Sequence, residues 1–232
     1  MWIAGADGCR AGWVVVLHDA ESGTLRPRVV SSGRGLLSLA ETPAALGVDL
    51  PMGLPERAER GGRACDRAAR RLLGRPRASS VFAPPVRAVL DAESYDEAQA
   101  ANRRSSPEGI GLSIQAYHLV KKIRALDGLL TPPRQAFVRE VHPEVSFAAM
   151  NGGTGLAASK KTPEGRARRR TLLVDAGLDP PEETPSGAAP DDLLDACAAC
   201  WTAARIARGT ARRFPETAPP TDARGLRMEI WR

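Results

Sequence analysis

The first twenty residues alternate between apolar runs and glycines, a pattern that predicts a pair of strands joined by a tight turn. Trp2 to Ala6 forms a short run of apolar and small residues, and Trp13 to Leu17 is rich in β-branched residues, which suit a pleated sheet. Gly8 and Gly12 flank the turn between the runs, where backbone angles that other residues avoid are often needed. The pattern therefore predicts an antiparallel hairpin.

The next thirty residues predict a third strand, a helix and a fourth strand. Leu25 to Ser32 would extend the hairpin to a three-stranded meander, and Gly33 to Leu46 carries apolar residues at helical spacing. Gly47 to Leu50 is a short apolar run that Pro51 ends. A strand that follows a helix commonly returns parallel to an earlier strand, so we expect the fourth strand to lie beside the first.

Residues 51–232 predict mainly helices. We expect a single domain over residues 1–208, with a helical insertion at 56–128 and a C-terminal tail at 209–232 that packs along the surface or joins a partner. Glycine and proline divide the remaining pattern into a strand at 135–141 and helices at 56–73, 93–103, 113–126, from Pro163 towards Ala176, and from Pro190 onward. Strands that alternate with helices indicate the α/β class.

Composition fits a soluble, basic protein. The 232 residues are 43% hydrophobic, and the formal net charge of +6 favours a polyanionic partner. No apolar run reaches the roughly 18 residues that a membrane span needs, and the N-terminus lacks a signal-peptide pattern, so we expect a cytoplasmic protein without a membrane partner. The four cysteines fit reduced, buried thiols in that compartment.

Acidic residues lie where the first and fourth strands end. Asp7 and Asp49 would both lie at carboxyl ends of neighbouring strands, and such ends line the functional crevice of open α/β sheets. A charge there is costly unless it is paired or bound to a metal. Asp7 can equally be a residue whose side chain accepts hydrogen bonds from a turn, and both readings stay open.

A third acidic group opens the last helix. Asp191 and Asp192 fall in its first turn, where negative charge is favourable, and Asp195 lies on the face that they share. Carboxylates this close repel one another unless a positive charge lies between them.

Basic and hydroxyl side chains that suit phosphate oxygens lie mainly in the first half of the chain. A proline-braced connector explains the 75–85 loop equally well, and residues 160–170 can equally form a solvated helix face. The expected substrate-binding residues are Arg75, Arg77, Ser79, Ser80, Arg87, Lys121 and Lys122.

Six sequence motifs follow one another along the chain. They are Gly5–Trp13, Val48–Pro55, Cys65–Arg70, Pro76–Phe82, Glu140–Glu144 and Asp191–Ala196. In this order they resemble a family of predicted nucleases with a ribonuclease H-like fold, catalogued as domain of unknown function 429. The last motif is also similar to the Asp-x-x-Asp-Ala helix of Holliday-junction resolvases.

The resemblance implies a mixed sheet of five strands, three antiparallel and two parallel, flanked by helices. It also implies a site in which Asp7, Asp49 and Asp195 bind Mg²⁺ or Mn²⁺ and Glu140 and Asp192 assist catalysis. Two such ions about 3.5–4 Å apart can activate water and stabilise the leaving oxygen during phosphodiester hydrolysis. The expected partner is DNA or RNA, and resolvases act as dimers, so a homodimer is a further expectation.

Other interpretations remain beside the nuclease. His142 can be a proton carrier, or part of a turn that Glu144 anchors. A non-catalytic module that binds nucleic acid or protein would bind without metal. An actin-like or sugar-kinase-like phosphotransferase would instead bind nucleotide. Resolvases carry Glu on the fourth strand, so the shorter Asp49 departs from their pattern.

Overall fold

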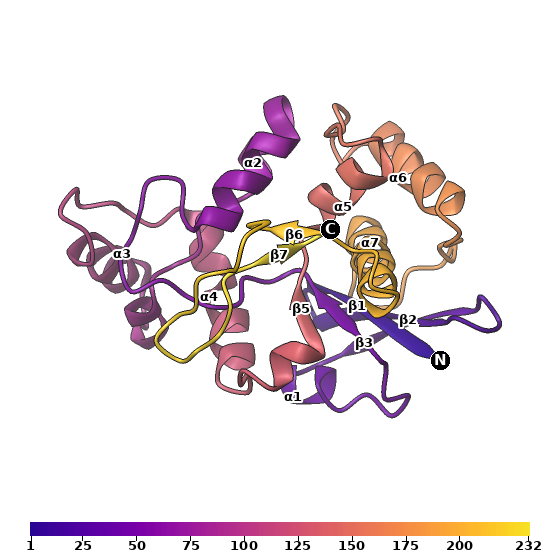
Figure 1. Ribbon diagram of the computed structural model, residues 1–232, viewed down its shortest axis with the longest axis horizontal. Coiled ribbons are helices and arrows are strands. Elements are labelled where there is room, and N and C mark those ends of the chain that lie inside the picture. The colour runs from indigo at the N-terminus through magenta and orange to yellow at the C-terminus, as the bar shows by residue number, and fades with distance from the viewer.

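A mixed sheet of five strands forms the centre of the computed structural model, which describes residues 1–232 (Figure 1). Its strand order is β3-β2-β1-β4-β5, with the first three strands antiparallel and β4 and β5 parallel to β1. This arrangement confirms the expected α/β class and mixed sheet. The strands are β1 (Trp2–Cys9), β2 (Gly12–Asp19), β3 (Leu25–Val30), β4 (Leu46–Val48) and β5 (Val138–Glu140).

The hairpin between β1 and β2 depends on Gly12. Cys9 pairs with Gly12 across a turn of two residues, and Gly12 has a φ of 136°. A Cβ at this position would lie 2.3 Å from the backbone oxygen of Val30 in β3. Glycine therefore lets the turn close while β3 passes beside it.

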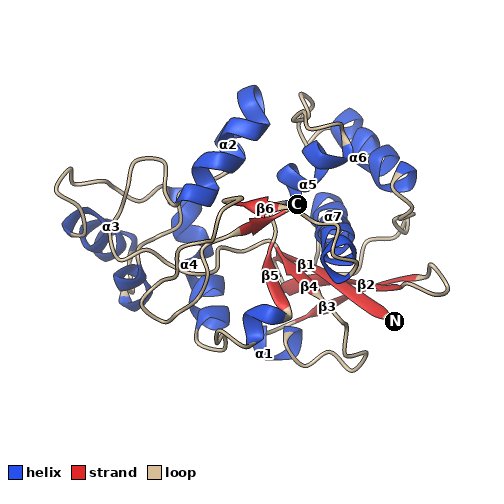
Figure 2. Cartoon of the chain, in the orientation of Figure 1, coloured by secondary structure: helices blue, strands red, loops and turns tan.

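Seven helices surround the sheet (Figure 2). None combines the length and hydropathy that crossing a bilayer requires. The helices are α1 (Gly33–Leu36), α2 (Ala64–Arg77), α3 (Tyr95–Arg104), α4 (Ile114–Asp127), α5 (Pro143–Met150), α6 (Pro163–Asp175) and α7 (Pro190–Ala207), with 3-10 turns at Ala78–Ser80, Arg87–Asp91 and Arg134–Ala136.

Two expected helices are shorter than their apolar patterns predicted. Helix α1 ends at Leu36, and turns carry the chain to β4, because Pro43 lacks the N–H group that a helix needs. Helix α2 begins at Ala64 instead of residue 56. Gly61 and Gly62 precede it with φ of 79° and 73°, angles that a right-handed helix does not contain.

The sheet separates two hydrophobic layers. Side chains alternate along β1, so Ile3 and Cys9 pack on the α7 side and Ala4 and Ala6 pack on the α4 side. Ile123 of α4 belongs to this second layer. Helix α4 thus lies within the expected 56–128 insertion and also covers one face of the central sheet.

Helix α7 lies against β1 and β4 because both strands carry glycine beneath it. A Cβ at Gly5 would lie 2.0 Å from the backbone nitrogen of Cys200, and one at Gly47 would lie 2.6 Å from the backbone oxygen of Ala199. These glycines let the backbone of α7 approach the sheet closely. The N-terminal turns of α7 therefore lie near the ends of the two strands.

Replacing Gly5 with alanine is expected to lower the free energy of unfolding by about 3 kcal/mol, the upper part of the range for overpacked cores. The new methyl group would meet helix backbone, which cannot rotate away. Chemical denaturation measures the change. Gly128→Ala is the matched control, because its Cβ would have only one ordinary contact, 3.5 Å from the Arg124 oxygen. Equal stability of the two variants would contradict the close approach of α7.

The C-terminal tail is an integral part of the fold, not only a surface segment. Residues Arg213–Phe214 and Ile230–Trp231 form a two-stranded sheet, β6 and β7, and Trp231 bridges to Val141 beyond β5. Leu226 is fully buried in the α4-side layer, and Asp222 accepts a hydrogen bond from the backbone N–H of Leu54 at 3.1 Å.

Candidate metal centre

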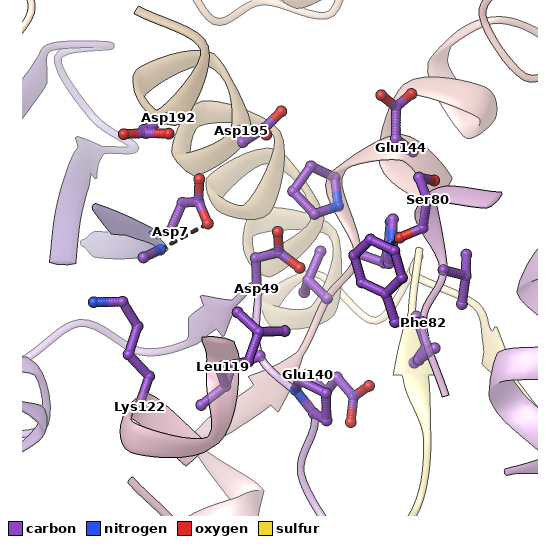
Figure 3. A pocket seen from close by; sticks show the side chains of 18 of the residues that line it. Asp7, Asp49, Ser80, Phe82, Leu119, Lys122, Glu140, Glu144, Asp192 and Asp195 are labelled. Atoms are coloured by element: carbon purple, nitrogen blue, oxygen red, sulfur yellow. Dashed lines mark hydrogen bonds between the residues drawn. The ribbon is translucent and has the colours of Figure 1, made fainter. Parts of the chain in front are cut away.

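Three aspartates from distant parts of the chain meet at one end of the sheet. Asp7, Asp49 and Asp195 each offer a carboxylate oxygen, and these three oxygens lie within 4.8 Å of one another. They line a cavity of about 320 Å³ (Figure 3). The structure therefore brings together the three residues that the sequence predicted as metal ligands.

Strand pairing explains why Asp7 and Asp49 converge. The parallel ladder between β1 and β4 ends at the pair Ala6 and Val48, and the N–H of Asp49 then donates to the Ala6 oxygen at 2.9 Å. Ala6 and Val48 face the α4 side, so the next residue of each strand faces α7. Asp195 lies in the second turn of α7, next to the ends of β1 and β4.

Burial makes the cluster electrostatically unfavourable when no cation is bound. Asp7 is 8% exposed and Asp195 is 1% exposed. Burial, followed by repulsion from Asp49 and Asp195, raises the pKa of Asp7 well above its usual range. Burial also raises the pKa of Asp49, and it raises the pKa of Asp195 to about 6. A bound cation would relieve both the repulsion and the lost hydration.

Asp7 also makes one local hydrogen bond. Its Oδ1 accepts a hydrogen bond of 2.7 Å from the N–H of Gly8, drawn as a dashed line in Figure 3. Gly8 belongs to β1 and pairs with Trp13, outside the two-residue turn, so this bond orients the carboxylate and does not form the turn.

Lys160 supplies a positive charge to this acidic cluster. Its ammonium group donates to Oδ2 of Asp195 and lies 3.8 Å from Asp191. Burial lowers the pKa of Lys160, but Asp195, Asp7 and Asp49 together raise it above its usual value. Sequence reasoning assigned this lysine to a generally basic stretch, whereas the structure places it at the carboxylates.

Glu144 is a fourth carboxylate at the cluster and was not among the expected catalytic residues. Its charge contributes to the raised pKa values of Asp49 and Asp195. Oε1 of Glu144 accepts a 2.6 Å hydrogen bond from Arg169, a fully buried residue of α6. Most of residues 160–170 are exposed, as a solvated face predicts, but Lys160 and Arg169 instead pair with carboxylates at the cluster.

The donor atoms present fit a hard divalent cation. Oδ1 of Asp195 and Oε2 of Glu144 are both buried without a hydrogen-bond partner. Buried oxygens normally have partners, and carboxylate oxygens are the ligands that Mg²⁺ and Mn²⁺ prefer. The unpaired atoms therefore indicate that the cluster can accept an ion through Asp7, Asp49 and Asp195, with Glu144 nearby.

Glu140 lines the same cavity but belongs to a separate buried ion-pair network. Its carboxylate pairs with Arg63 and accepts a 2.6 Å hydrogen bond from the N–H of Met52. Burial raises its pKa to about 7, with Arg63 acting in the opposite direction. Glu140 pairs with Val48, which faces α4, so the expected catalytic role of Glu140 is not supported by its position.

Asp192 lines the cavity and also begins α7. Its Oδ2 accepts a hydrogen bond of 2.9 Å from the N–H of Ala189, which caps the helix. Its charge contributes to the raised pKa of Asp7, so it lies within electrostatic reach of the three aspartates. It is therefore placed to support the site without being one of the three converging ligands.

His142 precedes α5 and lines the cavity. Its Nε2 lies 3.3 Å from the oxygen of Ser80, and its Nδ1 is buried without a partner. The segment after it forms a helix instead of a simple turn, with Glu144 in the first turn. A proton-carrying role for this ring stays a prediction.

Only two of the expected substrate-binding residues line the cavity. Lys122 donates to the oxygens of Cys9 and Gly12, at 3.0 and 2.8 Å, and Ser80 donates to the oxygen of Arg77 at 2.7 Å. Both groups therefore also stabilise local structure.

The other expected substrate-binding residues lie outside the cavity lining. Arg87 pairs with Asp127 and Asp222, an ion-pair network that joins α4 to the C-terminal tail. The structure thus assigns Arg87 a structural role that its charge alone did not reveal. The remaining residues lie at the end of α2, in the 3-10 turn that follows it, or at an exposed position of α4, and they are Arg75, Arg77, Ser79 and Lys121.

Metal affinity is expected to increase as pH rises. A proton on Asp195 must leave before the cation binds, because its pKa is raised to about 6, and the pKa of Asp7 is also raised well above its usual range. The apparent affinity for Mn²⁺ should therefore increase between about pH 5 and 8, with protons released on binding. Calorimetric titration in buffers of different ionisation enthalpy measures this proton release. Affinity independent of pH would contradict the predicted protonation.

The raised pKa values also predict how the stability of the metal-free protein changes with pH. The folded protein binds protons that the unfolded chain has lost, so this contribution to stability decreases as pH rises from about 4 through 6. A saturating divalent cation should remove the decrease.

A family model described as a protein of unknown function, DUF429, matches residues 5–219. No curated protein and no solved structure matches the chain.

Proposed function

We propose that this chain, which belongs to the family described as protein of unknown function DUF429, is a metal-dependent nuclease. We further propose that its fold is ribonuclease H-like, on the basis of the β3-β2-β1-β4-β5 order and a final helix that carries Asp195. The substrate would be nucleic acid, in keeping with the net charge of +6.

The observation that carries the proposal is the convergence of Asp7, Asp49 and Asp195. They come from β1, the end of β4 and α7, and their oxygens lie within 4.8 Å. A buried cluster of like charges is costly, and structures maintain such clusters where they serve a function. Oδ1 of Asp195, buried and unpaired, supports a role as a cation ligand.

The chemistry proposed is hydrolysis of a phosphodiester bond. Bound Mg²⁺ or Mn²⁺ would act as a Lewis acid and lower the pKa of bound water. Asp7, Asp49 and Asp195 would hold that cation, while Glu144 and Asp192 would add negative charge and orient neighbouring groups. The ammonium of Lys160 is positioned to stabilise negative charge on the reacting phosphate, since it already faces the three aspartates.

A cleavage assay tests the proposal directly. End-labelled single-stranded, duplex and branched DNA and RNA would be incubated with the protein and Mg²⁺, Mn²⁺ or EDTA. We expect cleavage that requires metal and that is lost in Asp195→Asn but retained in Asp175→Asn, an exposed position on α6. Metal-independent binding without cleavage of any substrate would instead favour the non-catalytic module.

Nucleotide protection in a thermal-shift assay would favour the phosphotransferase. The homodimer expected from the resemblance to resolvases stays a prediction, which sedimentation of the same preparation tests.

A further inference from the structure

Phe82 is an exposed aromatic residue at the rim of the carboxylate cavity. It is 38% exposed and is the single aromatic residue of phenylalanine, tyrosine or tryptophan type among the residues that line the cavity. Figure 3 shows its ring across the cavity from Asp7 and Asp192. An exposed ring beside a charged site needs an explanation, because apolar side chains gain free energy by leaving water.

The backbone on both sides of Phe82 is fixed. Val81 is 4% exposed, and its oxygen accepts a hydrogen bond of 2.8 Å from Nε of Arg70. Pro84 and Pro85 follow and are buried, which restricts the segment further. The ring is thus presented on a rigid support, as a stacking surface requires.

A second hollow lies on the other side of this segment. It has a volume of about 250 Å³, and Val81 and Phe82 line both hollows. Its remaining lining is mostly apolar or small, with polar groups from Glu59, Arg70, Asn102 and Ser113. Phe82 therefore lies between the carboxylate cavity and a neighbouring hollow with mostly apolar walls.

The depth of the carboxylates limits what can reach them. With Asp7 at 8% and Asp195 at 1% exposure, a phosphate must enter the cavity to approach the cluster. The volume of about 320 Å³ is at the small end for ligand sites. A DNA duplex is stiff over the length of such a recess, so a flexible single strand can bend into it more readily than a duplex can.

We infer that the cavity receives one unpaired nucleotide of a single strand, with its base stacked on Phe82 and the adjoining nucleotide in the neighbouring hollow. This inference rests on the proposed function, because that function requires the phosphate to point towards the aspartates. Base stacking on aromatic side chains tolerates all four bases, so the site would select single strands without selecting sequence.

The test measures binding to a fluorescently labelled ten-nucleotide oligothymidylate and to a duplex of the same length, with Ca²⁺ present. We expect Phe82→Ala to weaken single-strand binding by about 5- to 150-fold, the range for one stacked base, and Phe82→Trp to preserve it. An oligonucleotide that contains 2-aminopurine should show fluorescence quenching with the wild type and with Phe82→Trp, and not with Phe82→Ala.

Ile114→Ala is the matched control, since Ile114 is a 42% exposed apolar residue outside the two hollows. Equal affinity for duplex and single strand, or unchanged binding by Phe82→Ala, would overturn the inference. Duplex cleavage that is independent of Phe82 would retain the nuclease and reject the stacking site. Phe82-dependent binding without cleavage would retain the stacking site and reject the nuclease.

Discussion

Asp7→Asn is expected to lower the affinity for Mn²⁺ by more than 100-fold and to abolish metal-dependent cleavage. The substitution removes a charged ligand, whereas loss of a group that only supports a ligand typically costs about 10- to 100-fold. Asparagine keeps a side-chain oxygen that can accept the 2.7 Å hydrogen bond from Gly8, so the local backbone of β1 should persist. Calorimetric titration with Mn²⁺ measures the affinity.

The same substitution is expected to stabilise the metal-free protein at pH 7, because it replaces a carboxylate whose charged form is disfavoured by burial. Burial raises the pKa of Asp7, so the wild type loses stability by burying this group. The gain should shrink towards pH 4, where the unfolded carboxyl is also protonated. Loss of metal together with a gain in stability is the signature of a functional charge.

Glu140→Gln provides the contrast. It should reduce stability, since it removes the charge that pairs with buried Arg63, and it should leave Mn²⁺ affinity within a factor of a few. If Glu140→Gln abolished metal binding and Asp7→Asn did not, the assignment of ligands would be wrong.

Part of the convergence follows from regular structure. Asp7 lies in β1 and Asp49 directly follows β4, so the hydrophobic pattern and the parallel return of β4 predict that both lie at neighbouring strand ends. A helical period places Asp195 one turn after Asp191. The approach of α7 to these strand ends and the five-stranded mixed sheet were implied by the resemblance, because local patterns do not determine how distant elements pack.

The period of two residues along β5 also bears on Glu140. Val138 packs on the α4 side of the sheet, and Glu140 lies two residues later on the same strand. Glu140 therefore lies on the α4 side with its partner Val48, whereas Asp49 faces α7. The resemblance implied a catalytic role for Glu140 without using this parity along the strand.

Lys160 and Glu144 could not be placed from local patterns. The contact between Lys160 and Asp195 spans 35 residues and depends on the irregular segment before α6. A lysine in a basic stretch has the same sequence signal whether its charge is solvated or paired. Glu144 reaches the cluster only because α5 begins directly after β5, and its proline-initiated helix was not predicted.

Lys160→Met is expected to separate metal binding from stability. In the metal-free protein it should lower the free energy of unfolding by roughly 3 kcal/mol, the low end for a broken buried ion pair. We expect a loss at the low end of that range because the Lys160 side chain is 32% exposed, although that of Asp195 is only 2% exposed. Denaturation in EDTA measures this loss.

The same variant should bind Mn²⁺ at least about 10-fold more tightly. One unit charge at 4 Å contributes up to about 4 kcal/mol at an effective dielectric constant of 20, so removing a competing ammonium group favours a cation. Its cleavage rate at saturating metal should nevertheless decrease by about 100-fold, since one positive group facing the phosphate is lost. Tighter metal binding with slower turnover would distinguish a catalytic charge from a counter-ion.

Lys161→Met is the matched control because the adjacent lysine pairs with Asp191 at 2.6 Å but is 69% exposed. Exposed pairs contribute about 1 kcal/mol or less, so stability and metal affinity should change little. If Lys160→Met weakened Mn²⁺ binding instead, the lysine would be organising the carboxylates and not competing for them. If both lysine variants behaved alike, the effect would be the general loss of positive charge near α7, and Lys160 would have no specific place in the site.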